Sequence, residues 1–220
     1  MLTPGINPTL PTIKISGSVK DGEKQQNLES SSPETKLHLD TLAIFRDTNL
    51  VGYVNEEESR IINILNRRTA YSLTSVKYKD NNIVFHLSNF SIKRKATLEN
   101  NQPIIDVSLK ATAAINEINT NADLSDPDTI TKINQLLENK IKNDILDTIH
   151  TTQNEFQSDI FGFGNLFYQK YPKYFSDIEL DWDKKVYATV KINADVNIDL
   201  ETKGSLEQTI RREMYGKTTK

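Results

Sequence analysis

Three histidines are the side chains in this sequence best suited to bind a metal ion or to transfer a proton near neutral pH. They are His38, His86 and His150, and the chain has no cysteine that would complete a thiolate site. The three lie on separate segments, and no carboxylate near them has the spacing of a metal-binding motif. We interpret them as surface or strand histidines, and we expect no metal ion.

Gly162-Phe163-Gly164 looks like part of a phosphate-binding loop, in which backbone N–H groups surround phosphate oxygens. It follows a predicted helix rather than a strand, and the third glycine, the lysine and the Ser/Thr of such loops are missing. Neither a Gly-x-Ser-x-Gly elbow nor a His-Glu-x-x-His motif occurs in the sequence. We interpret the triplet as a chain reversal that places Phe161 and Phe163 in the core, and we expect no catalytic residue and no cofactor.

Glu56-Glu57-Glu58 is a run of carboxylates of the kind that acid–base mechanisms use, but its position indicates another role. The run follows Asn55, a good helix cap, and begins a predicted helix. Carboxylates in a first helical turn interact favourably with the positive end of the helix dipole. Capping therefore explains this run without catalysis.

Aromatic side chains are dense between residues 161 and 182. They are Phe161, Phe163, Phe167, Tyr168, Tyr171, Tyr174, Phe175 and Trp182. The plainer interpretation is that they pack a broken helical segment onto a sheet. The alternative is a surface for a partner or a ligand, because Tyr and Trp are enriched at interfaces.

Composition excludes several classes of protein. Of the 220 residues, 36% are hydrophobic and 26% are charged, which is typical of a globular chain. The net charge of −3 argues against a dedicated nucleic-acid binder, which needs a basic surface. No apolar run approaches the ~20 residues that span a bilayer. The amino terminus has neither the basic start nor the apolar stretch of a secretion signal. If the parent protein is exported, we expect this chain to have lost its leader.

Residues 1–68 predict a smaller β-rich unit with one helix. Residues 21–36 are poor in apolar side chains and rich in Gly, Ser, Gln and Glu, which indicates a linker or a long mobile loop. Two strand-like segments, 37–45 and 50–54, then flank a turn, as in a hairpin. A helix over residues 56–67 follows.

Residues 69–204 predict a larger α+β domain, and residues 205–220 a tail. Apolar and polar residues alternate over 105–115 and 186–200, so each strand has one buried and one wet face. We therefore expect an antiparallel sheet with helices packed on one face. The phase of the alternation switches near Ser88-Asn89, which predicts a β-bulge.

One long helix is predicted near residues 127–157. Ser125-Asp126-Pro127 supplies a capping side chain and a proline in the first turn. Apolar residues then recur at three- and four-residue steps, at Ile130, Ile133, Leu137, Ile141, Ile145 and Ile149. This single apolar stripe is suited to cover one face of the sheet.

An ordered set of motifs resembles a known family. Residues 158–164, Ser-Asp-Ile-Phe-Gly-Phe-Gly, followed by Tyr171-Pro172-Lys173 and Asp181-Trp182, closely resemble the signature of the Ger(x)C family. A second match joins Leu42-Ala43-Ile44-Phe45-Arg46, Leu50-Val51-Gly52-Tyr53 and Asn55-Glu56-Glu57-Glu58-Ser59. The third is Leu124-Ser125-Asp126-Pro127, and together the matches cover about residues 8–204 in the family's order.

The resemblance implies a function that the residues alone do not reveal. The Ger(x)C family supplies the C subunits of nutrient germinant receptors in endospore-forming bacteria. Its members are lipoproteins held at the outer surface of the inner spore membrane, beside membrane-embedded A and B subunits. They have no cofactor and no catalytic residues. By this resemblance the chain is the C-terminal soluble part of such a subunit, an interaction and signalling module and not an enzyme.

The same resemblance marks five structurally important residues: Asp159, Gly162, Gly164, Pro172 and Trp182. We expect Asp159 to end the long helix and to cap the next one. We expect Gly162 to need a backbone conformation or a closeness that a side chain forbids. Trp182 is expected to anchor the segment that leads into the last strand.

Two other functions compete with the interaction module. A small-molecule domain would bind a nutrient directly, with the aromatic cluster as its surface. A cell-wall hydrolase would need a placed pair of acids or a set of metal ligands, and the sequence offers neither. The interaction module predicts a monomeric isolated fragment that binds neither nutrient nor nucleic acid.

Overall fold

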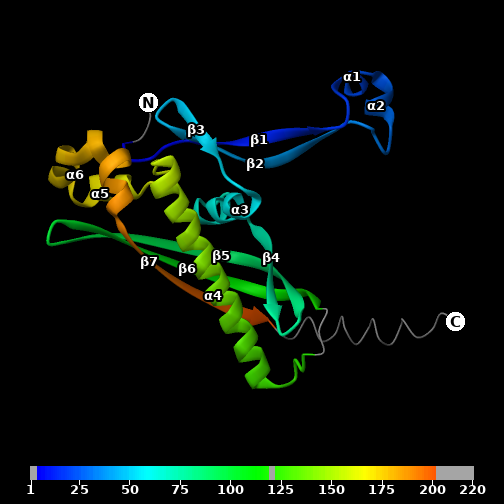
Figure 1. Ribbon diagram of the computed structural model, residues 1–220. Coiled ribbons are helices and arrows are strands. Elements are labelled where there is room, and N and C mark those ends of the chain that lie inside the picture. Colours follow the sequence, from blue (N-terminus) through cyan, green and yellow to red (C-terminus); the bar gives the residue numbers. More distant parts are fainter. Residues whose placement is uncertain (1–3, 119–121, 202–220) are drawn as a thin grey trace. The chain divides into compact units, whose positions relative to one another are not determined.

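The computed structural model describes residues 4–118 and 122–201 of the chain (Figure 1). The predicted tail at 205–220 lies outside the described residues. Helices and sheets both occur, which confirms the predicted α+β class. In the part of the chain that the structure describes, no helix is long and apolar enough to cross a membrane.

The chain divides into two compact units, each of which we describe by itself. Of the described residues, the first unit contains 4–59 and 151–188, and the second contains 60–118, 122–150 and 189–201. The limits predicted from the sequence, 68 and 69, lie between the two β-sheets but do not follow these units. The predicted limits differ from the structural units because residues 151–188, which follow the long helix, belong to the first unit.

The first unit begins with an antiparallel sheet in the order β1-β2-β3. These strands span Thr9–Ser16, Lys36–Arg46 and Asn49–Tyr53. We call β1 and β2 the ribbon. We consider the half of the ribbon that contains the end of β1 and the start of β2. There, two residues that pair directly across the strands lie on the same face, and so do alternate residues along each strand. Four exposed aliphatic side chains lie on that face: Ile13, Ile15, Leu37 and Leu39.

Residues 17–35 close the end of the ribbon with two short helices, α1 (Val19–Gly22) and α2 (Gln25–Glu29). Asn27 fixes this tip, because its Nδ2 donates to the Thr35 carbonyl and its Oδ1 accepts from the Thr35 N–H, both at 2.9 Å. The interpretation of 21–36 as a linker or mobile loop is therefore wrong at α2 and Thr35. The segment folds with few apolar residues because side chain–backbone hydrogen bonds, rather than a core, hold it.

The first turn of α3 (Glu56–Leu65) belongs to the first unit. The Asn55 N–H donates to the Glu58 carboxylate at 2.9 Å, and the Glu58 N–H donates to Asn55 Oδ1 at 2.9 Å. This reciprocal capping box satisfies N–H groups that a helix start leaves without partners. The predicted role of Asn55 as a cap is confirmed.

The rest of the first unit is helical. It comprises the π-helical turn η1 (Thr152–Phe156), α5 (Phe163–Lys170), α6 (Pro172–Ile178), and the short turns η2 (Glu179–Asp181), η3 (Trp182–Val186) and η4 (Tyr187–Thr189). Pro172 begins α6, where its missing N–H costs no hydrogen bond. The break between α5 and α6 falls at Tyr171, directly before that proline.

The second unit is built on a four-stranded sheet in the order β4-β5-β6-β7. The strands span Tyr71–Tyr78, Asn81–Glu99, Gln102–Ile118 and Lys191–Glu201. β4, β5 and β6 pair antiparallel, and β5 is irregular between Ser88 and Ser91, with Asn89 at φ 54°. The predicted bulge near Ser88-Asn89 is therefore confirmed.

The prediction of antiparallel pairing is wrong for the last strand, because β7 pairs parallel with β6, from Ile104 opposite Lys191 to Ala114 opposite Glu201. The chain between the two strands includes α4 (Pro127–Thr151) and the helical part of the first unit. Such a long crossover allows β7 to start level with the beginning of β6. Alternation of apolar and polar residues reports which face is buried, and it does not report strand direction.

The helix α4 is the long helix predicted from the sequence, and it crosses the sheet in Figure 1. Asp126 caps it by accepting the Thr129 N–H at 3.1 Å, and η1 extends it to Phe156. Its apolar stripe is buried at Ile133, Leu137, Ile141, Ile145 and Ile149. The sheet buries an apolar face at Ile83, Phe85, Leu87, Ile105, Val107 and Leu109.

Two polar side chains of α4 also hold the edge of β7. Asn134 Nδ2 donates to the Ile198 carbonyl at 3.1 Å, and the Ile198 N–H donates to Glu138 Oε1 at 2.8 Å. An edge strand otherwise presents such groups to any passing chain. We call Asn134 and Glu138 the edge clamp.

Candidate functional site

The residues of the family signature meet at one turn, residues 158–164, which we call the signature turn. The preceding helix ends at Gln157, whose φ of 47° is left-handed and redirects the chain. Ser158 and Asp159 follow and are completely buried. Ser158 Oγ donates to the Phe45 carbonyl of β2 at 2.6 Å, which fixes the turn against the sheet of the first unit.

Five neutral N–H groups surround the Asp159 carboxylate. Oδ1 accepts the backbone N–H groups of Phe161, Gly162 and Phe163 at 3.1, 2.9 and 3.2 Å. Oδ2 accepts the Gly164 N–H at 2.7 Å and the Trp182 indole Nε1–H at 3.0 Å. We call Asp159 and these five donors the carboxylate cage. Asp159 thereby satisfies the N–H groups of Phe163 and Gly164, the first two residues of α5, and so caps that helix from a position three residues before the N-cap Gly162.

A second carboxylate, that of Asp183 in η3, binds the backbone of Asp159 and so supports the cage. Its Oδ1 accepts the Asp159 backbone N–H and the Asn7 side-chain Nδ2, both at 2.8 Å. Burial raises the pKa of Asp159 to about 6, although its hydrogen bonds from Gly164, Phe163 and Trp182 act in the opposite direction. Burial also raises the pKa of Asp183.

Both glycines of the signature turn occupy positions that exclude a side chain. Gly162 has φ 74°, a conformation that L-residues rarely adopt. A Cβ at Gly164 would lie 2.6 Å from Trp182 Nε1 and 2.8 Å from Gly5 Cα. Any substitution at Gly164 therefore displaces the indole, the chain at Gly5, or both.

The aromatic cluster is mostly the core of this part of the first unit. The rings of Phe167, Phe175 and Tyr187 lie 5.6, 5.7 and 6.2 Å from the Trp182 ring. Phe161, Phe163, Phe167, Phe175 and Trp182 are at most 1% exposed. Tyr171 and Tyr174 are partly exposed, and Tyr168 is 47% exposed. The packing interpretation therefore fits the buried rings better than a ligand surface does.

The structure brings Asp159, Gly162, Gly164 and Trp182 into contact, and it places Pro172 apart at the start of α6. Sequence reasoning missed Asn7 and Asp183. Asn7 lies between Pro4 and Pro8, in a stretch with no periodic pattern that would mark it. Asp183 directly follows the Asp181-Trp182 motif, which was the one available signal for it.

The three histidines remain on separate elements, β2, β5 and α4. The ring of His86 stacks on Tyr71, with 5.6 Å between ring centroids. Within residues 4–118 and 122–201, no three His, Asp or Glu side chains gather as metal ligands would. Asp159 is fully buried among its donors, so its carboxylate is not accessible to a substrate.

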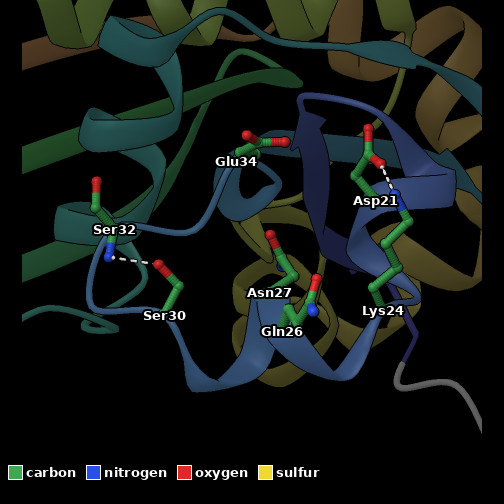
Figure 2. A pocket seen from close by; sticks show the side chains of 7 residues that line it. All are labelled: Asp21, Lys24, Gln26, Asn27, Ser30, Ser32 and Glu34. Carbon is green, nitrogen blue, oxygen red and sulfur yellow. Dashed lines mark hydrogen bonds and ion pairs between the residues drawn. The ribbon is translucent and has the colours of Figure 1, made fainter.

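A hollow of about 640 Å³ lies where the ribbon meets its tip, and it is lined in part by Ile15, Val19 and Leu37. Two smaller surface hollows also belong to the first unit. Figure 2 shows the polar one at the tip of the ribbon, about 260 Å³, where Lys24 Nζ pairs with Asp21 at 2.6 Å and the Ser32 N–H donates to Ser30 Oγ at 3.1 Å. Two pairs of its lining residues, Asp21 with Lys24 and Ser30 with Ser32, thus bind each other. The other, about 370 Å³, lies beside the signature turn and is lined in part by residues 4–7, Arg46 and Lys184.

The fold and this turn define a C-terminal domain found in spore germination proteins. The chain belongs to the family described as "Spore germination B3/GerAC like, C-terminal", whose model matches residues 40–204. The resemblance to the Ger(x)C family is thereby confirmed.

Individual relatives agree with this membership. Spore germination protein KC of Bacillus subtilis is 22% identical over 94% of this chain and 51% of its own length. Spore germination protein B3 of Bacillus subtilis is 18% identical over 71% of this chain and 42% of its own. The chain thus spans about half the length of these relatives.

The crystal structure of the GerBC protein has the same fold. It superposes with a TM-score of 0.70 at 16% identity, covering 89% of this chain and 57% of that chain.

Proposed function

We propose that this chain is the C-terminal part of a non-catalytic subunit of a spore nutrient germinant receptor. In this role it is an interaction and signalling module beside membrane-embedded A and B subunits. A lipid anchor in the full-length subunit would hold it at the outer surface of the inner spore membrane. The family match over residues 40–204 and the names of its relatives as spore germination proteins support the proposal.

The carboxylate cage is the observation that carries the non-catalytic part of the proposal. Asp159, the one fully buried carboxylate of the signature, has both oxygens occupied by N–H groups of its own chain. A general acid or nucleophile must instead reach a substrate with a free lone pair or proton. The signature therefore builds structure, and the surface is left to carry the function.

Two surfaces support the interaction part of the proposal. β7 alternates along its length, and Lys191, Asp195 and Asp199 lie on its exposed face. The ribbon also exposes aliphatic side chains, with Leu39 79% exposed. Exposed apolar groups that adjoin one another are typical of contact sites.

Crosslinking in dormant spores tests the proposal directly. A photoreactive amino acid is placed at surface positions of the full-length subunit, on β7 and on the ribbon, and crosslinked partners are identified by mass spectrometry. We expect crosslinks to membrane-embedded receptor subunits from one contiguous face. Positions inside the core, such as Phe167, are the matched negative control.

The competing nutrient-binding function is tested on the isolated chain. Thermal-shift and calorimetric measurements with amino acids and sugars would reveal a ligand, because at one hundred times its Kd a ligand stabilises the fold by ~2.7 kcal/mol. We expect no stabilisation. A saturable stabilisation together with an absence of receptor crosslinks would contradict the interaction module and favour direct nutrient binding.

A further inference from the structure

Residues 4–8 cross the signature turn, and we call them the strap. At its end the Pro8 carbonyl accepts the Phe45 N–H of β2 at 3.2 Å. Two further backbone hydrogen bonds join the strap to the signature turn and to α5. The Asn7 N–H donates to the Asp159 carbonyl at 2.8 Å, and the Asn165 N–H donates to the Gly5 carbonyl at 3.1 Å. Asn7 also uses both ends of its amide, since Nδ2 donates to Asp183 at 2.8 Å and Oδ1 accepts the Asp47 N–H at 2.9 Å.

The strap also closes the carboxylate cage sterically. Gly5, at φ 68°, approaches the signature turn so closely that a Cβ on it would lie 2.4 Å from the Gly164 carbonyl carbon. Gly164 in turn donates to Asp159 and contacts the Trp182 indole. Ile6 lies over Gly162, where an added Cβ would be 3.2 Å from Ile6 Cδ1. Departure of the strap therefore opens the cage to water.

Little apolar burial holds the strap in place. Asn7 is buried, but Pro4, Gly5 and Pro8 are only partly covered, and Ile6 is 37% exposed. The hollow of about 370 Å³ borders residues 4–7 and leaves room for them to move. Segments with few apolar contacts and a solvated backbone open at a lower free energy than the core does.

We propose that the strap is a releasable latch: it detaches from the signature turn as a unit while the rest of the first unit stays folded, and its release exposes Asp159 and Trp182 to solvent. Pro8 leads directly into β1, the edge strand of the ribbon. A force or a partner acting on the ribbon is therefore transmitted to the cage through three or four residues. This inference goes beyond the proposed function and does not depend on it.

Native-state hydrogen exchange on the whole chain tests the latch without any mutation. The amide protons of Asn7, Gly164 and Asn165 report the strap and the cage, and the amide of Val54, which donates to the Leu42 carbonyl, reports the sheet of the first unit. We expect the first three to exchange together, faster than the Val54 amide, with little dependence on low urea concentrations. Exchange of all four with one free energy and one urea dependence would overturn the proposal, because the strap would then open only on global unfolding.

Trp182 is the one tryptophan of the chain, so its fluorescence reports the cage alone. Gly5→Ala should lift the strap, because the new Cβ has no room, and Asn7→Ala removes two hydrogen bonds without adding bulk. We expect both variants to show red-shifted emission and a severalfold larger quenching by acrylamide, with an unchanged far-UV circular dichroism spectrum.

Gly22→Ala is the matched control, since its Cβ would meet only the Thr35 side chain at the tip of the ribbon, at 2.9 Å. It should leave Trp182 protected. The latch is overturned if Trp182 stays protected in both strap variants. It is equally overturned if Trp182 exposure in Asn7→Ala always coincides with loss of the circular dichroism signal, because the strap is then part of the cooperative core.

Discussion

Asp159 makes more of the hydrogen bonds that hold the signature turn than any other residue of the signature, through its side chain and its backbone. Its carboxylate caps α5, its carbonyl accepts the strap, and its N–H reaches Asp183. A buried carboxylate is costly unless hydrogen bonds replace its water. The five N–H donors compensate in part, and burial still leaves its pKa at about 6. The fold therefore depends on both the charge and the shape of this group.

The raised pKa predicts how stability responds to pH. The folded chain holds the Asp159 proton more tightly than the unfolded chain, whose ordinary value is 3.8. The corresponding stabilisation is fully present below about pH 4 and is lost as pH rises through about 6. The difference in free energy of unfolding between wild type and Asp159→Asn should therefore fall by about 3 kcal/mol over that window.

Urea denaturation of both proteins between pH 4 and 7.5 measures this difference. Asp183 and the other acids are present in both proteins, so their titration largely cancels. A difference that is constant or that grows with pH would contradict the raised pKa and would mean that the five N–H donors outweigh burial.

Trp182 is expected to be a core residue rather than a contact residue. It is 1% exposed, it packs among Phe167, Phe175 and Tyr187, and it donates to Asp159. Trp182→Ala should lower the free energy of unfolding by ~3–5 kcal/mol, because it leaves a cavity and removes one donor from a buried carboxylate.

Circular dichroism melts of Trp182→Ala provide the measurement. Tyr53→Ala, which truncates an aromatic ring that is 61% exposed, is the control and should change stability by less than about 1 kcal/mol. If Trp182→Ala melted like wild type while the response of spores to nutrient was lost, Trp182 would be a contact residue instead.

At the scale of elements, α4 does more than cover the sheet. Its edge clamp binds both backbone groups of Ile198, on the strand that pairs in parallel. Asn134 and Glu138 are one helical turn apart, so they lie on the same face of the helix. The clamp therefore fixes the position of β7 along α4 and occupies part of an open sheet edge.

Removing the clamp should loosen β7 selectively. Glu138→Ala deletes the acceptor of the Ile198 N–H, and we expect a loss of about 1–3 kcal/mol together with faster exchange of that amide. Asn134→Ala should have a smaller effect of the same kind. Asn143→Ala, an exposed position on the same helix, is the matched control and should change stability by no more than about 0.5 kcal/mol. If Glu138→Ala and Asn134→Ala both changed stability no more than Asn143→Ala does, the clamp would contribute nothing.

Elements with a strong local pattern were predictable from the sequence. The stripe from Ile133 to Ile149, the cap at Asp126 and the phase switch near Ser88 each encode their own structure. The parallel direction of β7 was not predictable, because it depends on the path of the intervening chain. The roles of Asn27 and Asn7 were not predictable for a similar reason, since single side-chain amides that bind the backbone of another segment leave no periodic signal. For the cage, the family signature named Asp159, Gly162, Gly164 and Trp182, but composition and spacing alone did not.

For the whole molecule, the order of the chain connects the surface to the buried site. The ribbon precedes α3, the signature turn follows α4, and residues 151–188 return to the unit in which the ribbon lies. The strap joins the start of the ribbon to the cage. In the proposed receptor subunit, surface contacts at the ribbon would act on the cage through this covalent path, while contacts on β7 would act on the second unit.

Charge reversal on β7 is the whole-molecule test of the interaction module. Lys191, Asp195 and Asp199 are exposed on one face of an edge strand, so Lys191→Glu, Asp195→Lys and Asp199→Lys should each change the free energy of unfolding by no more than about 0.5 kcal/mol. If this face meets another receptor subunit, the reversals should abolish the nutrient response of spores, because like charges brought together at an interface are strongly unfavourable. Asp195→Asn, which removes the charge without reversing it, is the matched control and should have a milder effect.

Thermal melts of the purified chain and germination assays of spores carrying the full-length variants supply the two readouts. A set of reversals covering every exposed face of the folded module, none of which affects germination, would refute the interaction module and leave direct sensing in the hollow beside the signature turn as the better explanation.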